Sequence, residues 1–244
     1  MYDARFAMRD LQCAICDTRF AIRDLRYAIS NMTELFLIRH GNAKKLKGEG
    51  YVTAPLTELG RKQADATGTY FKRAEIAFDG FYASPLKRAY ETASIIGAQI
   101  EQAPVARAGI QEMEYREWLP TLAVELFART GALNRYYETR AGQVVRHPLL
   151  GRISRAMTEI LRAHPQGRVA VVVHGGVVSG ILAWYLPRER QRWWRVTVGN
   201  CSITRLQIQD QNARVMALDE ISHLGELQAS AHVRNYTFSA QQRL

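Results

Sequence analysis

The chain has 244 residues, of which 47% are apolar and 23% charged, and these proportions are typical of a globular protein with one substantial core. The longest apolar stretches, around residues 169–173 and 177–186, are too short for a bilayer-spanning helix, so we expect no membrane partner. The net charge of +10 attracts anions of many kinds, and charge alone leaves phosphorylated small molecules and nucleic acid open as ligands.

Three cysteines, Cys13, Cys16 and Cys201, do not form a paired framework, and no secretory signal pattern opens the chain. We therefore expect a reducing, cytoplasmic setting. Cys13 and Cys16 have the spacing of a redox or metal-binding pair, but no second cysteine or histidine pair is placed to complete a tetrahedral site. We expect no metal and no cofactor.

The first thirty residues repeat a heptad in which Asp, Ala and a Met/Ile position recur. The four copies are Asp3–Arg9, Asp10–Cys16, Asp17–Arg23 and Asp24–Ser30. One interpretation is an amphipathic helical arm with an apolar seam. The other, which we favour, is a translated DNA repeat that precedes a start at Met32, because the copies resemble one another more than packing requires. We therefore divide the chain into an extension (1–31), one folded domain (32–226) and a tail (227–244).

Apolar runs bounded by turn residues predict the strands. Residues 35–38, 80–83 and 169–173 are short enough to be buried strands. Residues 201–209 and 213–219, separated by Asp210-Gln211-Asn212, predict a strand pair at the edge of the sheet.

Capping residues predict the helices between these strands. Thr57 caps a helix that continues to about Lys72, and Ser84 caps a second helix with Pro85 in its first position. A third helix is expected over 176–186, and most of the segment between 118 and 165 has helical patterns. The alternation predicts a three-layer α/β sandwich.

Two of the predicted strands end in a histidine followed by glycine. Arg39-His40-Gly41 follows the first strand, and His174-Gly175-Gly176 follows the strand over 169–173. Ligands of α/β proteins bind beyond the carboxyl ends of parallel strands, where backbone N–H groups are also available. A lone histidine is more often structural, but two at one sheet edge suit a phosphoryl group.

Two further segments complete the pattern: Ser84–Ala93, which contains Arg88, and Ile110–Trp118, which contains Glu112. Together the four segments, in this order, resemble the histidine phosphatase superfamily. The resemblance spans about residues 33–224. It implies a phosphoglycerate-mutase-like fold with a mostly parallel central sheet and a helical insertion over the pocket.

The resemblance also implies the site. His40 matches the nucleophile that becomes a phosphohistidine, and His174 matches the second histidine that binds the transferred group. Phosphate-binding positions match Arg39, Asn42, Arg88 and Gly175. Arginine forks suit phosphate oxygens, and phosphoryl transfer depends mostly on positioning and charge neutralisation.

Glu112 matches the acid/base glutamate, which protonates the departing alkoxide and later takes a proton from water. Glu114 is a rival, because two residues in an extended segment point to opposite faces and only one can serve. The alignment of Trp118 with the usual tryptophan of the family selects Glu112. The flanking glycines of the family motif are replaced here by Arg116 and Pro120.

We therefore expect a phosphomonoester hydrolase acting on a phosphorylated small molecule. The mutases carry a Glu-Ser-x-Trp-Asn segment that is absent after Asn42, which disfavours phosphoglycerate-mutase-type transfer. A non-catalytic phosphate-binding regulatory module is the alternative in another class. We do not expect nucleic acid as a partner, since the Trp193-Trp194 pair among arginines is better explained by packing. A homodimer is left open.

A chain that begins at Met32 should fold and keep its oligomeric state and kcat/KM, because every predicted site residue lies at Arg39 or later. An isolated heptad segment without tertiary packing contributes little stability in water. Thermal unfolding, size-exclusion chromatography and phosphatase assays of the truncated and full-length chains test this. A large fall in Tm, or conversion from oligomer to monomer, would identify the heptads as a structural arm.

Overall fold

The structure is a computed structural model that describes residues 32–44, 53–112, 148–185, 196–209 and 212–228. The proposed extension 1–31, the first part of the helical insertion and most of the tail lie outside the described residues, as do Glu114 and Trp118. The division into an extension, a domain and a tail therefore stays a prediction.

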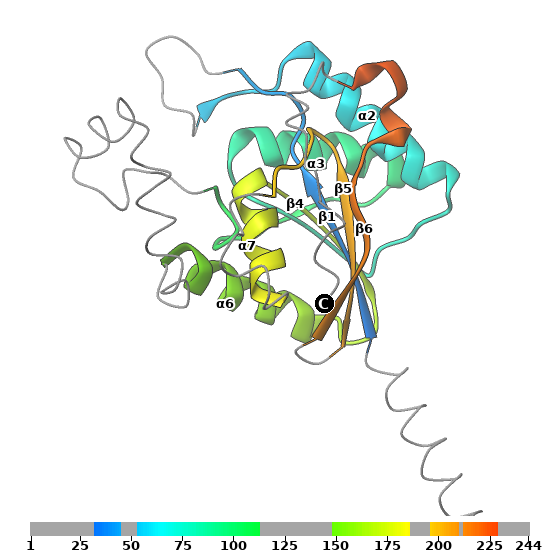
Figure 1. The fold of residues 1–244 in the computed structure, drawn as a ribbon. Helices are drawn as coiled ribbons and strands as arrows, with labels where there is room; N and C mark the ends of the chain where they lie inside the picture. Colours follow the sequence, from blue (N-terminus) through cyan, green and yellow to red (C-terminus); the bar gives the residue numbers. More distant parts are fainter. Residues whose placement is uncertain (1–31, 45–52, 113–147, 186–195, 210–211, 229–244) are drawn as a thin grey trace, which may run out of the picture.

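Six strands form one sheet in the order β3-β2-β4-β1-β5-β6 (Figure 1). β1 (Met32–Arg39), β2 (Gly80–Ala83), β3 (Val105–Ala106) and β4 (Arg168–Val173) pair in parallel. β5 (Ile203–Gln209) pairs antiparallel with β1, and β6 (Asn212–Glu220) pairs antiparallel with β5 at the edge. The mostly parallel sheet and the late strand pair are confirmed, whereas the two-residue β3 was not predicted.

Helices lie on both faces of this sheet, and the alternation of side chains along β1 shows which helices cover each face. Leu35 and Leu37 belong to the core cluster that contains residues of α6 (Pro148–Ala163) and α7 (Gly175–Tyr185). Phe36 and Ile38 belong to the cluster on the opposite face, with residues of α2 (Glu58–Arg73) and α3 (Lys87–Ile100). Period-two alternation therefore separates two cores, and the three-layer architecture is confirmed.

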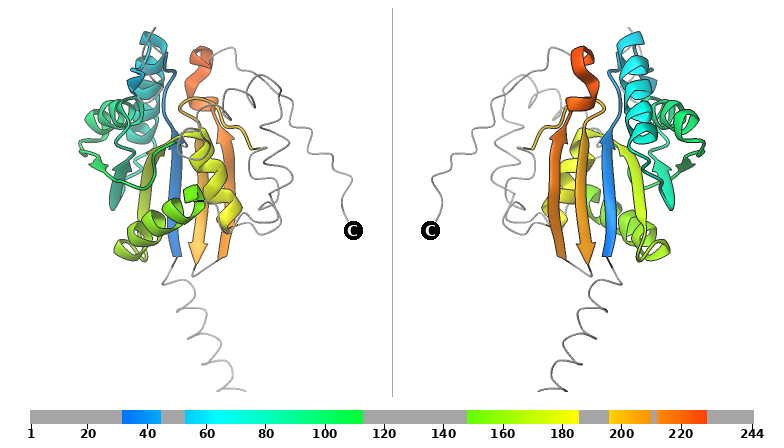
Figure 2. Two further views of the ribbon diagram at one scale, coloured as in Figure 1. Left: turned by 90° about the vertical axis from the view of Figure 1, so that its left-hand side faces the viewer. Right: turned by 90° about the vertical axis from the view of Figure 1, so that its right-hand side faces the viewer.

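Figure 2 shows the two faces in turn, with α6 and α7 in front of the strands in one view and behind them in the other. The segment 222–227 forms a short 3-10 helix, η6 (Ser222–Leu227), which packs beside α2. Within the described part of the chain, none of the helices combines the length and apolarity needed to cross a membrane.

One helix start is as predicted and one is not. The Thr57 hydroxyl accepts a hydrogen bond from Gly60 N at 3.1 Å and caps α2. The prediction that Ser84 caps the next helix is wrong, because α3 begins only at Lys87 and its cap position is Leu86. Ser84 still belongs to the sheet, since its N–H donates to Val172 O at 2.9 Å. The helix α3 therefore begins two residues later than predicted, and the Ser84 hydroxyl does not cap it.

Candidate active site

The parallel pairing of β1 and β4 brings the two predicted histidines together. Arg39 lies opposite Val173, and the next residue along each strand is a histidine. The His40 N–H continues the ladder to Val173 O at 2.9 Å. The two imidazole centroids are 5.1 Å apart and both side chains are buried. The expected meeting point at the carboxyl edge of the sheet is therefore present.

The hydrogen bonds of His40 define its tautomer. Nδ1 lies 2.7 Å from Gly41 O, and a carbonyl can only accept, so Nδ1 carries the proton. Nε2 is then the acceptor, and Arg88 Nε donates to it at 3.0 Å. Burial first, and then the charges of Arg88 and Arg39, lower the pKa of His40 to about 3. His40 is therefore a neutral imidazole whose Nε2 lone pair is oriented by an arginine.

Two arginines give this edge of the sheet its positive charge. Arg88, in the first turn of α3, is only 1% exposed although it is among the largest side chains of the protein. Arg39 donates through one terminal nitrogen to Val198 O, while its buried Nε has no hydrogen-bond partner among the described residues. Gly175 lies beside this nitrogen, since a Cβ built on the glycine would lie 3.8 Å from Nε, an ordinary packing distance.

The second histidine is held by Ser84. His174 Nε2 lies 2.8 Å from the Ser84 hydroxyl oxygen, and both side chains are fully buried. His174 Nδ1 is also buried and has no hydrogen-bond partner among the described residues. Burial, followed by the charges of His40, Arg88, Arg39 and Arg152, lowers the pKa of His174 well below its usual range. An anion placed here would relieve both the positive potential and the unmatched nitrogen.

Close backbone packing fixes the turn after His40. A Cβ on Gly41 would lie 2.5 Å from Gly60 O, so only glycine allows α2 to approach this turn. Asn42 accepts a hydrogen bond from the Thr57 hydroxyl through Oδ1 at 2.8 Å. This bond uses the carbonyl end of the Asn42 amide and leaves its NH₂ group as the end that could donate to phosphate.

Glu112 lies at the amino terminus of α7, the helix that begins directly after His174. Its Oε2 accepts a hydrogen bond from Gly176 N at 3.2 Å, and a Cβ on Gly176 would clash with Oε1 at 2.5 Å. The N–H groups at the helix N-terminus have no partner within the helix and supply donors for a carboxyl oxygen at this position. The structure therefore brings Glu112 to the same sheet edge as the two histidines.

Sequence patterns did not identify three contacts that hold the site. Ser84 was predicted as a helix cap but contacts His174. Asn200 Nδ2 donates to His40 O at 3.0 Å from the loop before β5. The Thr92 hydroxyl accepts from Gly41 N at 3.0 Å, one turn beyond Arg88 on α3. The spacing of Arg88 and Thr92, four residues apart on one helix face, is the only local signal for any of them.

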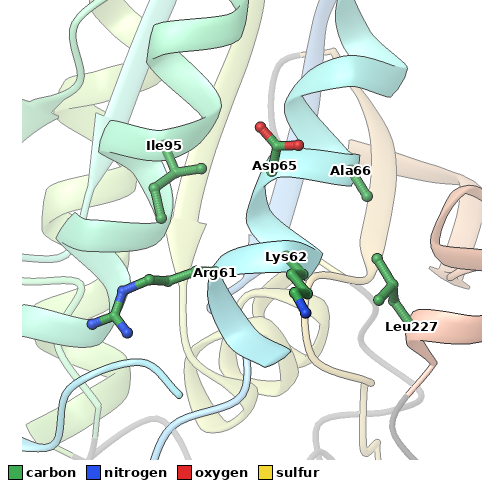
Figure 3. Close-up of a pocket in the computed structure, with 6 residues that line it drawn as sticks. All are labelled: Arg61, Lys62, Asp65, Ala66, Ile95 and Leu227. Carbon is green, nitrogen blue, oxygen red and sulfur yellow. The ribbon is translucent and has the colours of Figure 1, made fainter. Parts of the chain in front are cut away.

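A separate open cavity of about 510 Å³ lies between α2, α3 and the end of η6 (Figure 3). Its lining residues are Arg61, Lys62, Asp65, Ala66, Ile95 and Leu227. None of the predicted site residues lines it. Arg61 is paired with Glu91, and Lys62 with Glu58, so its cations are already compensated. In the described ranges, no group of three or more His, Cys, Asp or Glu side chains could hold a metal ion.

The fold and these contacts define an α/β protein with two histidines and two arginines gathered at the carboxyl edge of its sheet. The sequence profile of the histidine phosphatase superfamily (branch 1) matches residues 35–221, and the chain belongs to this family. The match confirms the resemblance inferred from the motifs.

Two of the relatives are named phosphoserine phosphatases, and each match covers most of both chains. Phosphoserine phosphatase 1 of Hydrogenobacter thermophilus is 24% identical over 211 residues, covering 82% of this chain and 99% of the relative. The metal-independent phosphoserine phosphatase of Arabidopsis thaliana is 28% identical over 215 residues, covering 81% and 86%. Among solved structures, phosphoglycerate mutase of Bacillus anthracis superposes with a TM-score of 0.64 at 21% identity, covering 83% of this chain and all of that chain. The last similarity establishes the fold.

The buried, neutral state of His40 predicts a stability that depends on pH. Unfolded histidine takes up a proton below about pH 6.5, whereas folded His40, with its pKa lowered to about 3, does not. The unfolded state therefore binds more protons, and the contribution of His40 to stability is lost as pH falls from about 6.5 towards 3. Compared with His40→Asn, the wild type should lose about 2 kcal/mol more unfolding free energy between pH 7 and pH 5. Urea denaturation of both proteins at the two pH values measures this, and parallel losses would contradict the assignment.

Proposed function

We propose that the protein hydrolyses phosphomonoesters through a phosphohistidine on Nε2 of His40, with Glu112 as general acid and base. The observation that carries the proposal is the His40 tautomer. Nδ1–H is committed to Gly41 O, so the remaining lone pair is on Nε2, and the lowered pKa keeps it unprotonated. A nucleophile that is already neutral needs no base to activate it.

In the first step, the Nε2 lone pair attacks phosphorus and the bond from phosphorus to the ester oxygen breaks. Glu112 donates its proton to that oxygen, which leaves as an alcohol. The guanidinium groups of Arg39 and Arg88 neutralise the equatorial oxygens, and His174 Nδ1, when it carries the proton, donates to one of them. The Arg88 N–H that bonds Nε2 in this structure is close enough to move to a phosphoryl oxygen.

In the second step, water attacks the phosphohistidine from the side that the alcohol has left. Glu112, now ionised, takes a proton from that water as the new phosphorus–oxygen bond forms. The nitrogen–phosphorus bond breaks, its electrons return to Nε2, and inorganic phosphate leaves. Glu112 regains its proton and the cycle is complete, so the atoms and charges of the two steps balance without a metal or an organic cofactor.

A phosphorylated small molecule is the proposed substrate class. Two relatives named phosphoserine phosphatases are matched over 99% and 86% of their length, whereas relatives named serine/threonine-protein phosphatases are matched over only 58–64% of theirs. The fuller match favours a small phosphomonoester as the substrate. The missing mutase segment after Asn42 argues against phosphoglycerate-mutase-type transfer. A non-catalytic phosphate-binding module would need the arginines but would not need Glu112 at the amino terminus of α7. A cytoplasmic location, the lack of a nucleic-acid partner and a homodimer stay predictions.

His40→Ala should abolish phosphate release, since it removes the side chain proposed to take the phosphoryl group. During turnover of ³²P-labelled substrate, the wild type should carry an acid-labile, base-stable label that the variant lacks. His164→Ala is a matched control, because that histidine bonds Tyr82 and Thr33 near the amino end of β1, away from the carboxyl edge, and its loss should leave labelling intact. Undiminished turnover by His40→Ala would refute the mechanism.

Glu112→Gln should impair alkyl phosphates far more than p-nitrophenyl phosphate, whose leaving group needs little protonation. General acid catalysis contributes about 10²- to 10⁴-fold, so kcat/KM for glycerol 2-phosphate should fall by about 100-fold or more. The value for p-nitrophenyl phosphate should fall by less than about 10-fold. Glu226→Gln, on the exposed side of η6, is the control. Equal losses on both substrates would argue that Glu112 only binds or stabilises.

A further inference from the structure

The segment that carries Glu112 is held by α6, a helix that supplies none of the residues assigned so far. Residues 107–112 leave β3 and run along this helix. Gly109, with φ of +96°, packs so closely that an added Cβ would lie 2.8 Å from Ala156 Cβ. Arg107 forms an ion pair with Glu159 one turn further along α6. Two contacts therefore fix the course of the segment before it reaches the acid.

Arg152 makes the contact nearest to Glu112. One terminal nitrogen of its guanidinium donates to Gln111 Oε1 at 2.7 Å, and the other donates to Gln111 O at 3.1 Å. The same Oε1 accepts from Gly109 N at 2.7 Å. The arginine fork thus binds the side chain and the main chain of one residue at once, which a lysine cannot do.

The carbonyl of Gln111 belongs to the same planar peptide unit as the N and Cα of Glu112. Fixing that carbonyl therefore fixes the plane from which the Glu112 side chain departs. At the other end of the side chain, Gly176 N of α7 holds the carboxylate at 3.2 Å. Glu112 is consequently held from both ends, by α6 through Arg152 and by α7 through a backbone N–H.

We propose that Arg152 is the positioning residue for Glu112, and that it keeps the carboxyl group aligned with the leaving oxygen. This inference rests on the proposed function of Glu112 as the acid. Arg152 is also near enough to the pocket for its charge to contribute to the lowered pKa of His174. Each of its terminal nitrogens donates to Gln111, and these two bonds direct the guanidinium toward the segment that carries the acid.

Leaving-group dependence separates positioning from general destabilisation. The test uses kcat/KM, which reports the steps up to phosphoenzyme formation and excludes the later attack of water. Misplacing a catalytic group by about 1 Å can cost about 100-fold, so Arg152→Met should lower kcat/KM for glycerol 2-phosphate by about 10- to 100-fold. The value for p-nitrophenyl phosphate should fall by less than about 3-fold, because its leaving group needs little protonation.

Two further variants keep the test decisive if Arg152→Met unfolds. Gln111→Leu removes the side-chain half of the contact, so its loss of kcat/KM should show the same leaving-group selectivity but be smaller. The kcat/KM of Arg152→Lys should lie between the values for the wild type and Arg152→Met. The double variant Arg152→Met/Gln111→Leu should lose no more than Arg152→Met alone, since the two residues act as one unit. Arg155→Met is the matched control, because this arginine is exposed one turn along the same helix and should behave as wild type.

Equal losses on both substrates would overturn the positioning role, as would a loss confined to KM, which would make Arg152 a substrate contact. Unchanged kinetics on both would overturn it as well. These results are distinct from failure of the proposed function, which would appear as turnover or phosphoenzyme labelling that survives in His40→Ala.

Discussion

The parallel pairing of β1 with β4 is the constraint on which the site depends. These two strands are separated by more than a hundred residues in the chain, yet the register of Arg39 on Val173 sets both histidines at one height. A slip of one residue would send every side chain of β1 to the opposite face and exchange its two cores. The buried leucines and phenylalanine of β1 therefore fix the register, and the register fixes the distance between His40 and His174.

Burial then decides the charge state of the site. Water is excluded from both imidazoles, and two arginine guanidinium groups lie beside them, so each histidine is neutral and the pocket as a whole is positive. The cost of this arrangement falls on the folded protein without substrate, because Arg88 is nearly inaccessible to water. In the proposed mechanism a phosphoryl group would supply the missing negative charge, and charges that are already in place before it binds are the preorganisation that phosphoryl transfer requires.

Local patterns in the sequence were sufficient for five of the six strands, most helix positions and the two histidines, because each of these depends on neighbouring residues. Contacts between distant segments were not predictable in this way. Ser84 satisfied the rule for a helix cap, but its place in the ladder beside Val172 gave the hydroxyl to His174, 90 positions away in the chain. β3 was missed because two exposed residues carry no periodic signal. The motifs identified Glu112, whereas Arg152, which donates to the neighbouring Gln111, lies on a helix in which we recognised no motif.

The proposed nucleophile and the proposed acid therefore have separate supports. His40 is fixed by β1, β4 and α3 through backbone bonds and Arg88, whereas Glu112 is fixed by α6 and α7. Substitutions on α6 can therefore alter how well the acid meets a particular leaving group while the phosphoryl pocket stays intact. Selection for a new alcohol moiety would then act on α6 and the segment 107–112, and selection for phosphoryl chemistry on the sheet edge.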